Sequence, residues 1–183
     1  MPSWSRIATR SRVPLGFLFA VAYLGYAHPT WISLVAGSMA IASGLGIRAA
    51  ASGHIRKNAE LAVTGPYART RNPLYLGSLV MALGFILAAR NIWIGVAALA
   101  MFLFIYVPVI QSEEAYLRSA FPEYRDYSAQ VPRLWPRLTA YRARANDSVP
   151  AFSWELYMRH HEYNAILGSA LIVGALILKM VLV

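Results

Sequence analysis

The chain has 183 residues, of which 58% are hydrophobic and only 14% are charged. This composition excludes an ordinary soluble domain, in which about 25% of the residues are charged. The formal net charge is +9 and there is no cysteine, which excludes disulfides, thiolate nucleophiles and cysteine-ligated metals. We therefore expect an all-α integral membrane protein.

Five apolar stretches predict about five transmembrane helices. In chain order they cover residues 13–27, 31–47, 74–89, 92–110 and 165–183. Several are shorter than the ~20 residues that cross a bilayer comfortably, so we expect interfacial Trp, Tyr and Arg side chains to complete the spans. The polar link 28–30 is very short and the next apolar run follows it directly, so the first stretch is expected to be a retained helix rather than a cleaved signal peptide.

The basic residues predict an orientation in the membrane. Almost all of them precede the first crossing or follow an even-numbered one, and only Arg90 and Lys179 lie on the other side. The positive-inside rule then places the N-terminus in the cytoplasm and the C-terminus outside. Anionic lipid headgroups explain these dispersed arginines, so we expect membrane lipid and no nucleic acid as a partner. The compact chain without long soluble insertions favours the cytoplasmic membrane of a prokaryote.

The sequence divides into three parts, without an internal repeat or a low-complexity linker. Residues 1–60 form an N-terminal transmembrane hairpin, and residues 61–137 carry the candidate site. Residues 138–183 form an interfacial connection and a C-terminal transmembrane helix. The connection ends in a short helix in which Glu155 and Arg159, four residues apart, can pair.

The first candidate motif is a polar, turn-rich segment between two apolar regions. Gly65-Pro66 predicts a rigid turn, Arg71 brings a fixed charge to the membrane edge, and Asn72-Pro73 is a favourable start for the next helix. A polar segment in this position is expected to be a site at a helix N-terminus. The segment, residues 64–77, reads Thr-Gly-Pro-Tyr-Ala-Arg-Thr-Arg-Asn-Pro-Leu-Tyr-Leu-Gly.

A second motif follows the fourth apolar stretch, about forty residues further on. Two adjacent carboxylates, Glu113 and Glu114, are costly at a membrane boundary, and several tyrosines and arginines follow them. If the third and fourth helices form a hairpin about Arg90-Asn91, the two motifs return to the same face of the membrane. The topology therefore predicts one shared pocket.

Together, these motifs resemble the core of the isoprenylcysteine carboxyl methyltransferase and phospholipid methyltransferase superfamily. The similarity covers roughly residues 61–137. It implies a methyltransferase that binds S-adenosylmethionine from the cytosolic side, while a lipophilic acceptor enters from the bilayer. The acceptor that the resemblance implies is a prenylcysteine carboxylate, a phospholipid amine or another small lipophile. The matching residues are Gly65-Pro66-Tyr67, Arg71-Asn72-Pro73, Tyr75, Gly77, Glu113-Glu114, Tyr124, Tyr127 and Val131-Pro132-Arg133.

The resemblance also implies roles for these side chains. Glu114, with Glu113 beside it, would hold the amino group of the methionine moiety, and either Arg71 or Arg133 would hold its carboxylate. Either Tyr67 or Tyr75 would place an aromatic face near the sulfonium. The implied catalytic residues are Arg71, Glu113, Glu114 and Arg133. The implied cofactor-binding residues are Tyr67, Arg71, Asn72, Pro73, Tyr75, Gly77, Glu114, Tyr124 and Tyr127.

The chemistry of the acceptor decides whether a base is needed. A carboxylate acceptor needs none, whereas an amine or thiol must lose a proton, and one of the two glutamates would then act as the base. The chain departs from the superfamily at Asn72, where a His is usual. Asn can donate and accept hydrogen bonds but cannot titrate, so a polar contact would survive there and a proton transfer would not.

Other interpretations remain open. Asn72-Pro73 also fits a simple helix cap, and Glu114 with Arg118 fits a surface ion pair. His160 and His161 do not indicate a metal site, because adjacent helical side chains point about 100° apart and no third ligand is evident. Integral-membrane sterol reductases resemble this superfamily in their C-terminal half, so an NADPH-dependent reductase is one alternative. An inactive lipid-binding scaffold is another. The oligomeric state is not determined by the sequence.

Overall fold

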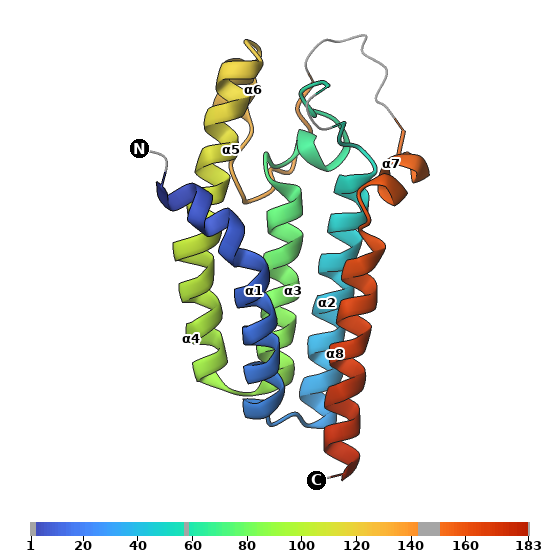
Figure 1. Ribbon diagram of the computed structural model, residues 1–183. Helices are drawn as coiled ribbons and strands as arrows, with labels where there is room; N and C mark the ends of the chain where they lie inside the picture. Colours follow the sequence, from blue (N-terminus) through green and yellow to red (C-terminus); the bar gives the residue numbers. More distant parts are fainter. Residues whose placement is uncertain (1–2, 57–58, 143–150, 183) are drawn as a thin grey trace. The chain divides into compact units, whose positions relative to one another are not determined.

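The computed structural model describes residues 3–56, 59–142 and 151–182, with only the backbone described for residues 3–14. All regular structure in these ranges is helical, which confirms the all-α prediction. One short element, η1, is a 3₁₀ helix and another, η2, is a π-helix. In chain order the elements are α1 (Ser3–Tyr26), α2 (Trp31–Ser52), η1 (Gly65–Ala68), α3 (Pro73–Ala89), α4 (Ile92–Met101), η2 (Phe102–Tyr106), α5 (Val107–Ala120), α6 (Tyr124–Gln130), α7 (Trp154–Arg159) and α8 (Tyr163–Leu182) (Figure 1).

Three of the described helical stretches are long and apolar enough to cross a membrane: Trp31–Ser52, Ile92–Ala120 and Tyr163–Leu182. Two shorter apolar helices, Leu15–Tyr26 and Pro73–Ala89, lie at the remaining predicted positions. These helices make the chain an integral membrane protein, while the number of five crossings stays a prediction.

The helix boundaries extend beyond the apolar stretches that predicted them. The predicted start at Pro73 is confirmed for α3, which fits proline's preference for the first helical position. At the other extreme, the predicted span 92–110 ends too early, because the helix continues to Ala120. Residues 111–120 are polar but rich in good helix formers. An apolar run therefore marks the part of a helix that lies in lipid and not the end of the helix.

The long stretch of α4, η2 and α5 contains one wider turn. In η2 the backbone N–H of Val107 donates to the carbonyl oxygen of Phe102, five residues earlier. Pro108 follows directly, and a proline has no N–H and excludes the carbonyl four residues before it. The π-turn thus lies where the regular hydrogen-bond ladder cannot continue. The rings of Phe102 and Tyr106 stack across this turn, with centroids 6.0 Å apart.

The chain folds as two compact units, and each is described by itself. The first unit contains residues up to 42, residues 81–115 and residues from 167 onward. The second contains residues 43–80 and 116–166. These units are spatial and discontinuous in the sequence, and the functional division into residues 1–60, 61–137 and 138–183 stays a prediction.

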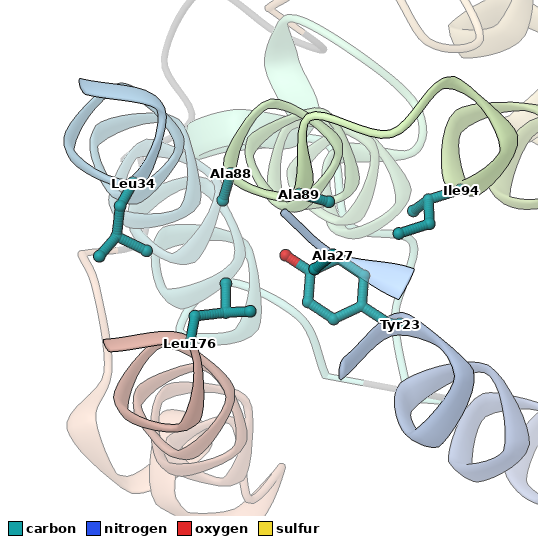
Figure 2. Packing of buried hydrophobic residues seen from close by; sticks show 7 residues of the cluster. All are labelled: Tyr23, Ala27, Leu34, Ala88, Ala89, Ile94 and Leu176. Carbon is teal, nitrogen blue, oxygen red and sulfur yellow. The ribbon is translucent and has the colours of Figure 1, made fainter. Parts of the chain in front are cut away.

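The first unit has an apolar core to which α1, α2, α3, α4 and α8 contribute. In Figure 2 the side chains of Tyr23, Leu34, Ala88, Ala89, Ile94 and Leu176 point toward one another, with Ala27 from the link after α1. The Tyr23 hydroxyl donates to the Phe85 carbonyl oxygen over 2.9 Å. This bond satisfies a polar group that would otherwise be costly in an apolar core.

The end of α1 is held by a side chain from α8. The Lys179 ammonium donates to the carbonyl oxygens of Leu24, Gly25 and Ala27 at 2.8, 3.0 and 2.9 Å. The last carbonyls of a helix have no partner within the helix, and a cation is favourable there. Lys179 therefore connects α8 to the link between α1 and α2.

Within the first unit, α2 and α3 approach each other through two glycines. A Cβ atom at Gly84 would lie 2.6 Å from the Gly37 carbonyl oxygen and 2.8 Å from the backbone nitrogen of Ile41. A Cβ atom at Gly37 would in turn lie 2.5 Å from the Gly84 carbonyl oxygen. Small residues of this kind let helix backbones come close in lipid, where apolar burial alone does not drive association.

In the second unit, a charged pair joins α2 to the residue before α8. The Arg48 guanidinium contacts both carboxylate oxygens of Glu162, with the shortest distance 2.8 Å, and also donates to the Ser78 hydroxyl on α3. The side chains of Arg48 and Glu162 are 23% and 12% exposed. This pair therefore fastens three helical segments to one another at a partly desolvated point.

Substitution of Gly84 by Ala is expected to destabilise the first unit. The new methyl group would overlap backbone atoms of α2, which costs about 1–3 kcal/mol. Gly174→Ala is the matched control, because nothing lies within 4 Å of its Cβ position and Ala is the better helix former by about 1 kcal/mol. Thermal unfolding followed by circular dichroism in detergent measures both. Equal midpoints for the two variants would contradict the close approach.

The Arg48–Glu162 pair is expected to show strong coupling. Arg48→Met or Glu162→Leu alone leaves a partly buried charge without its partner, at a cost of about 3 kcal/mol or more in the free energy of unfolding. The double variant Arg48→Met/Glu162→Leu removes both charges. Its free energy of unfolding should fall by much less than the sum of the decreases in the two single variants. Denaturant unfolding of the four proteins in one detergent measures this cycle, and additive losses would show that the pair is uncoupled.

Candidate active site

The first motif is held in place by backbone hydrogen bonds to the segment after α6. The Arg71 N–H donates to the Pro132 carbonyl oxygen over 3.0 Å. In the opposite direction, the N–H groups of Arg137 and Tyr141 donate to the carbonyl oxygens of Arg69 and Ala68, at 2.9 and 2.8 Å. Two segments outside the α-helices, residues 68–72 and 131–141, thus satisfy each other's polar backbone.

Two side chains of the motif strengthen this pairing. The buried Thr70 hydroxyl lies 3.2 Å and 3.0 Å from the carbonyl oxygens of Arg133 and Leu134. The Asn72 side-chain amide donates to the same Arg133 carbonyl over 3.1 Å. Asn72, where the superfamily usually has His, therefore supplies a donor that orients the chain around Arg133, and an imidazole N–H is a donor of the same kind.

A buried cluster of tyrosines lies under the motif. The Tyr127 hydroxyl, on α6, donates to the Tyr67 carbonyl oxygen in η1 over 2.7 Å. The Tyr127 ring packs edge to face against those of Tyr124 and Tyr141, with centroids 6.1 and 5.3 Å apart. Val131, which is also buried, completes the cluster. Tyr124 and Tyr127 therefore form the core of this part of the second unit.

Arg71 places its charge against this cluster. One of its terminal nitrogens lies 3.4 Å from the Tyr124 hydroxyl. Burial raises the pKa of the Tyr127 phenol well above its usual range, and Tyr124 adds to the rise, whereas the Arg71 charge opposes it and Tyr141 again raises it. At neutral pH the Tyr127 phenol is thus uncharged.

His54 explains why a glycine begins η1. Gly65 has a φ of +56°, a conformation in which a side chain is strained. A Cβ atom there would also lie 2.5 Å from the His54 ring. The His54 ring is itself held, because its Nδ1 lies 2.7 Å from the Ala50 carbonyl oxygen. The Gly65-Pro66 turn therefore packs on a fixed surface at the end of α2.

The remaining motif residues lie on α3. Pro73 is fully buried at its first position. A Cβ atom at Gly77 would lie 2.8 Å from the Gly44 carbonyl oxygen and 2.6 Å from the Arg48 side chain, so Gly77 permits the contact between α2 and α3. Tyr75, which lies between Pro73 and Gly77 in the sequence, is half-buried. Within the second unit, the structure brings Arg71 to Tyr124, Tyr127 to the Tyr67 backbone and Asn72 to the Arg133 backbone. The roles of these residues with the cofactor stay predictions.

The two glutamates belong to the first unit. Both lie on α5, where Glu113 is exposed and Glu114 is only 3% exposed. A buried carboxylate does not fit the surface ion pair considered for Glu114, and such burial is rare without a specific role. The shared pocket of the glutamates with Arg71 stays a prediction.

A protein-family comparison now adds to this geometry. A family model described as phospholipid methyltransferase matches residues 20–124, which is more than half of the chain. The chain belongs to this family. The match contains the first motif and both glutamates and ends at Tyr124. Most of α6 and the segment 131–141, on which the motif rests, lie beyond the part that the phospholipid methyltransferase model describes.

Two curated relatives are similar over most of the chain. The cobalt-zinc-cadmium resistance protein CzcN of Cupriavidus metallidurans is 30% identical over 75% of this chain and 68% of its own length. The nickel-cobalt-cadmium resistance protein NccN of Alcaligenes xylosoxydans xylosoxydans is 30% identical over 80% of this chain and 70% of its own length. No solved structure matches the chain significantly.

The sequence analysis did not predict three residues that contribute to the site of this phospholipid methyltransferase family member. Thr70 lies inside the motif, but only the structure shows that it is buried and that its hydroxyl bonds to the backbone of residues 133–134. Tyr141 lies beyond the predicted core 61–137, and His54 lies before it. No sequence signal marks these two residues, because their contacts depend on how distant segments meet.

The adjacent histidines make separate contacts. The Nδ1 atom of His160 lies 3.2 Å from the Ser52 carbonyl oxygen, and that of His161 lies 2.9 Å from the Tyr163 hydroxyl. Among the described residues, no group of three His, Asp or Glu side chains is arranged to hold a metal ion.

Substitution of Tyr127 by Phe is expected to lower stability and to remove a pH dependence. Loss of the bond to Tyr67 costs about 1 kcal/mol. Because the folded-state pKa is raised, the stability contributed by the neutral phenol is complete below the ordinary value of about 10 and is lost as the pH rises above it. Above about pH 10, the free energy of unfolding of the wild-type protein should fall by up to about 1.4 kcal/mol more per pH unit than that of Tyr127→Phe. Denaturant unfolding at pH 8 to 11.5 measures this, and parallel losses in the two proteins would contradict it.

Proposed function

We propose that this protein transfers a methyl group from S-adenosylmethionine to a lipophilic acceptor in the membrane. Its family supports methyltransferase chemistry, and its helices support a membrane location. The observation that carries the proposal is the placement of Arg71: it lies in a motif fastened by backbone hydrogen bonds and beside a buried tyrosine cluster.

The residues present fit the chemistry of this cofactor. Its methionine moiety has a carboxylate, for which Arg71 or Arg133 offers a guanidinium, and an ammonium group, for which Glu113 and Glu114 offer carboxylates. Tyr67 and Tyr75 offer aromatic faces of the kind that attract a sulfonium. When bound, the cofactor supplies a methyl group on a good leaving group. The contribution of the protein is then mainly to position the reactants and to exclude water.

The acceptor sets the remaining chemistry. A prenylcysteine carboxylate or another anionic lipophile attacks without losing a proton, and no base is then required. A phospholipid amine or a thiol must give up a proton, for which buried Glu114 is the candidate base. We further propose that the N-terminus and the motif lie in the cytoplasm of a prokaryote and that the C-terminus lies outside, as the distribution of the basic residues favours.

Calorimetric titration of the detergent-purified protein tests the function. S-adenosylmethionine and its product S-adenosylhomocysteine are both expected to bind, and Arg71→Ala should weaken binding about 10-fold to 100-fold, as loss of one charged hydrogen bond implies. Glu114→Ala should weaken it as well. Arg125→Ala is the matched control, because Arg125 is exposed on α6 and should leave the affinity unchanged.

The same titration distinguishes the alternatives. Binding of NADPH in place of the sulfonium cofactor would favour the reductase and overturn the proposal. Absence of binding by all three ligands, in protein with the circular dichroism of a folded helical chain, would favour the inactive scaffold. Where the cofactor binds, methyl transfer from a labelled donor to extracted membrane lipids identifies the acceptor class.

A further inference from the structure

The second unit has a polar cavity that lies outside the candidate active site. Its volume is about 410 Å³, within the range of known ligand pockets. The lining comes from α7 with its flanking residues and from the segment after α2. The lining residues are Arg56, Ala59, Ser153, Glu155, Leu156, Arg159 and His160.

Two guanidinium groups from distant parts of the chain meet at this cavity. Arg159 pairs with Glu155 on the same helix over 2.8 Å, and Arg56 lies 3.6 Å from Glu60. The two arginine side chains are 67% and 62% exposed. Ion pairs this exposed contribute little. Both guanidiniums can therefore turn to a phosphate, which they bind in a forked, bidentate geometry.

The carboxylate of Glu155 does not block an anion. It lines the cavity, but its side chain is 78% exposed, so it can turn into solvent when Arg159 takes another partner. His160 also lines the cavity, with Nδ1 held 3.2 Å from the Ser52 carbonyl oxygen. The lining thus offers two guanidinium groups and a held imidazole. The carboxylates that pair with the guanidiniums, Glu155 and Glu60, are 78% and 55% exposed and can both turn into solvent.

The short helix that lines the cavity has features typical of a bilayer interface. The short helix α7 exposes large apolar side chains, with Trp154 at 71% and Met158 at 54% exposure. The apolar span of α8 begins four residues after α7 ends. Exposed Trp beside the start of a span is typical of the headgroup region of a bilayer. At that depth the phosphate of a lipid is the abundant anion.

We propose that this cavity binds the phosphate of an anionic phospholipid and thereby holds α7 at the bilayer surface. Arg56 and Arg159 contact the phosphate oxygens, while Trp154 and Met158 lie among the upper parts of the acyl chains. The inference does not depend on the proposed methyl transfer, since the lipid here is a bound partner and no bond is formed or broken.

Native mass spectrometry of the full chain released from detergent tests the site. The probes are phosphatidylglycerol, phosphatidylcholine and inorganic phosphate, each titrated separately. Wild-type protein is expected to retain phosphatidylglycerol in preference to the other two. Arg56→Gln/Arg159→Gln should weaken this binding about tenfold or more, given roughly 1 kcal/mol for each basic residue at an anionic surface.

The control variant removes the same number of positive charges at positions outside the cavity. Arg125→Gln/Arg142→Gln removes two exposed arginines that do not line the cavity and should bind phosphatidylglycerol as the wild type does. Equal binding by the two double variants would overturn the proposal, and so would equal retention of phosphatidylcholine or retention of inorganic phosphate alone. Thermal unfolding shows whether each variant is folded, and Arg159→Gln alone replaces a double variant that is not.

Discussion

The polar backbone of residues 68–72, at and after the end of η1, has to find hydrogen-bond partners beside a bilayer, and this requirement organises the second unit. A chain outside a helix has N–H and C=O groups that are costly to leave unsatisfied near lipid. The segment after α6 supplies the partners: it pairs with Ala68, Arg69 and Arg71 through backbone groups and accepts the Thr70 and Asn72 side chains. The motif is therefore rigid because another non-helical segment is fastened to it.

This rigidity has a direct meaning for the proposed chemistry. Transfer from a sulfonium donor requires the reactants to be aligned more than it requires a strong acid or base. Arg71 is fixed at both ends, by its backbone bond to Pro132 and by its contact with Tyr124. The buried side chains of Tyr124, Tyr127 and Val131 pack together beside it. A site built in this way can position a charged cofactor beside a membrane at little cost in reorganisation.

Much of the fold could be predicted from the sequence. The apolar stretches predicted helices at all five positions, and Pro73 and the Glu155–Arg159 pair predicted the start of α3 and the character of α7. Hydrophobicity is a local property of the chain, so it marks where a helix meets lipid. It does not mark where the helix ends, and this is why the extension of α5 to Ala120 and the π-turn before Pro108 were missed.

The sequence by itself determined the class of protein, because composition carries that information, and it determined the residues of the first motif. The family followed from the resemblance of those motif residues to a known superfamily and from the family match. Only the tertiary structure decided what each motif residue contacts. It gave Asn72 and Thr70 the task of holding residues 133–134, placed Tyr141 and His54 around the site, and gave Gly77 and Gly84 their roles in helix contact. These contacts join segments far apart in the chain, and no local pattern specifies which backbone carbonyl a side chain will meet.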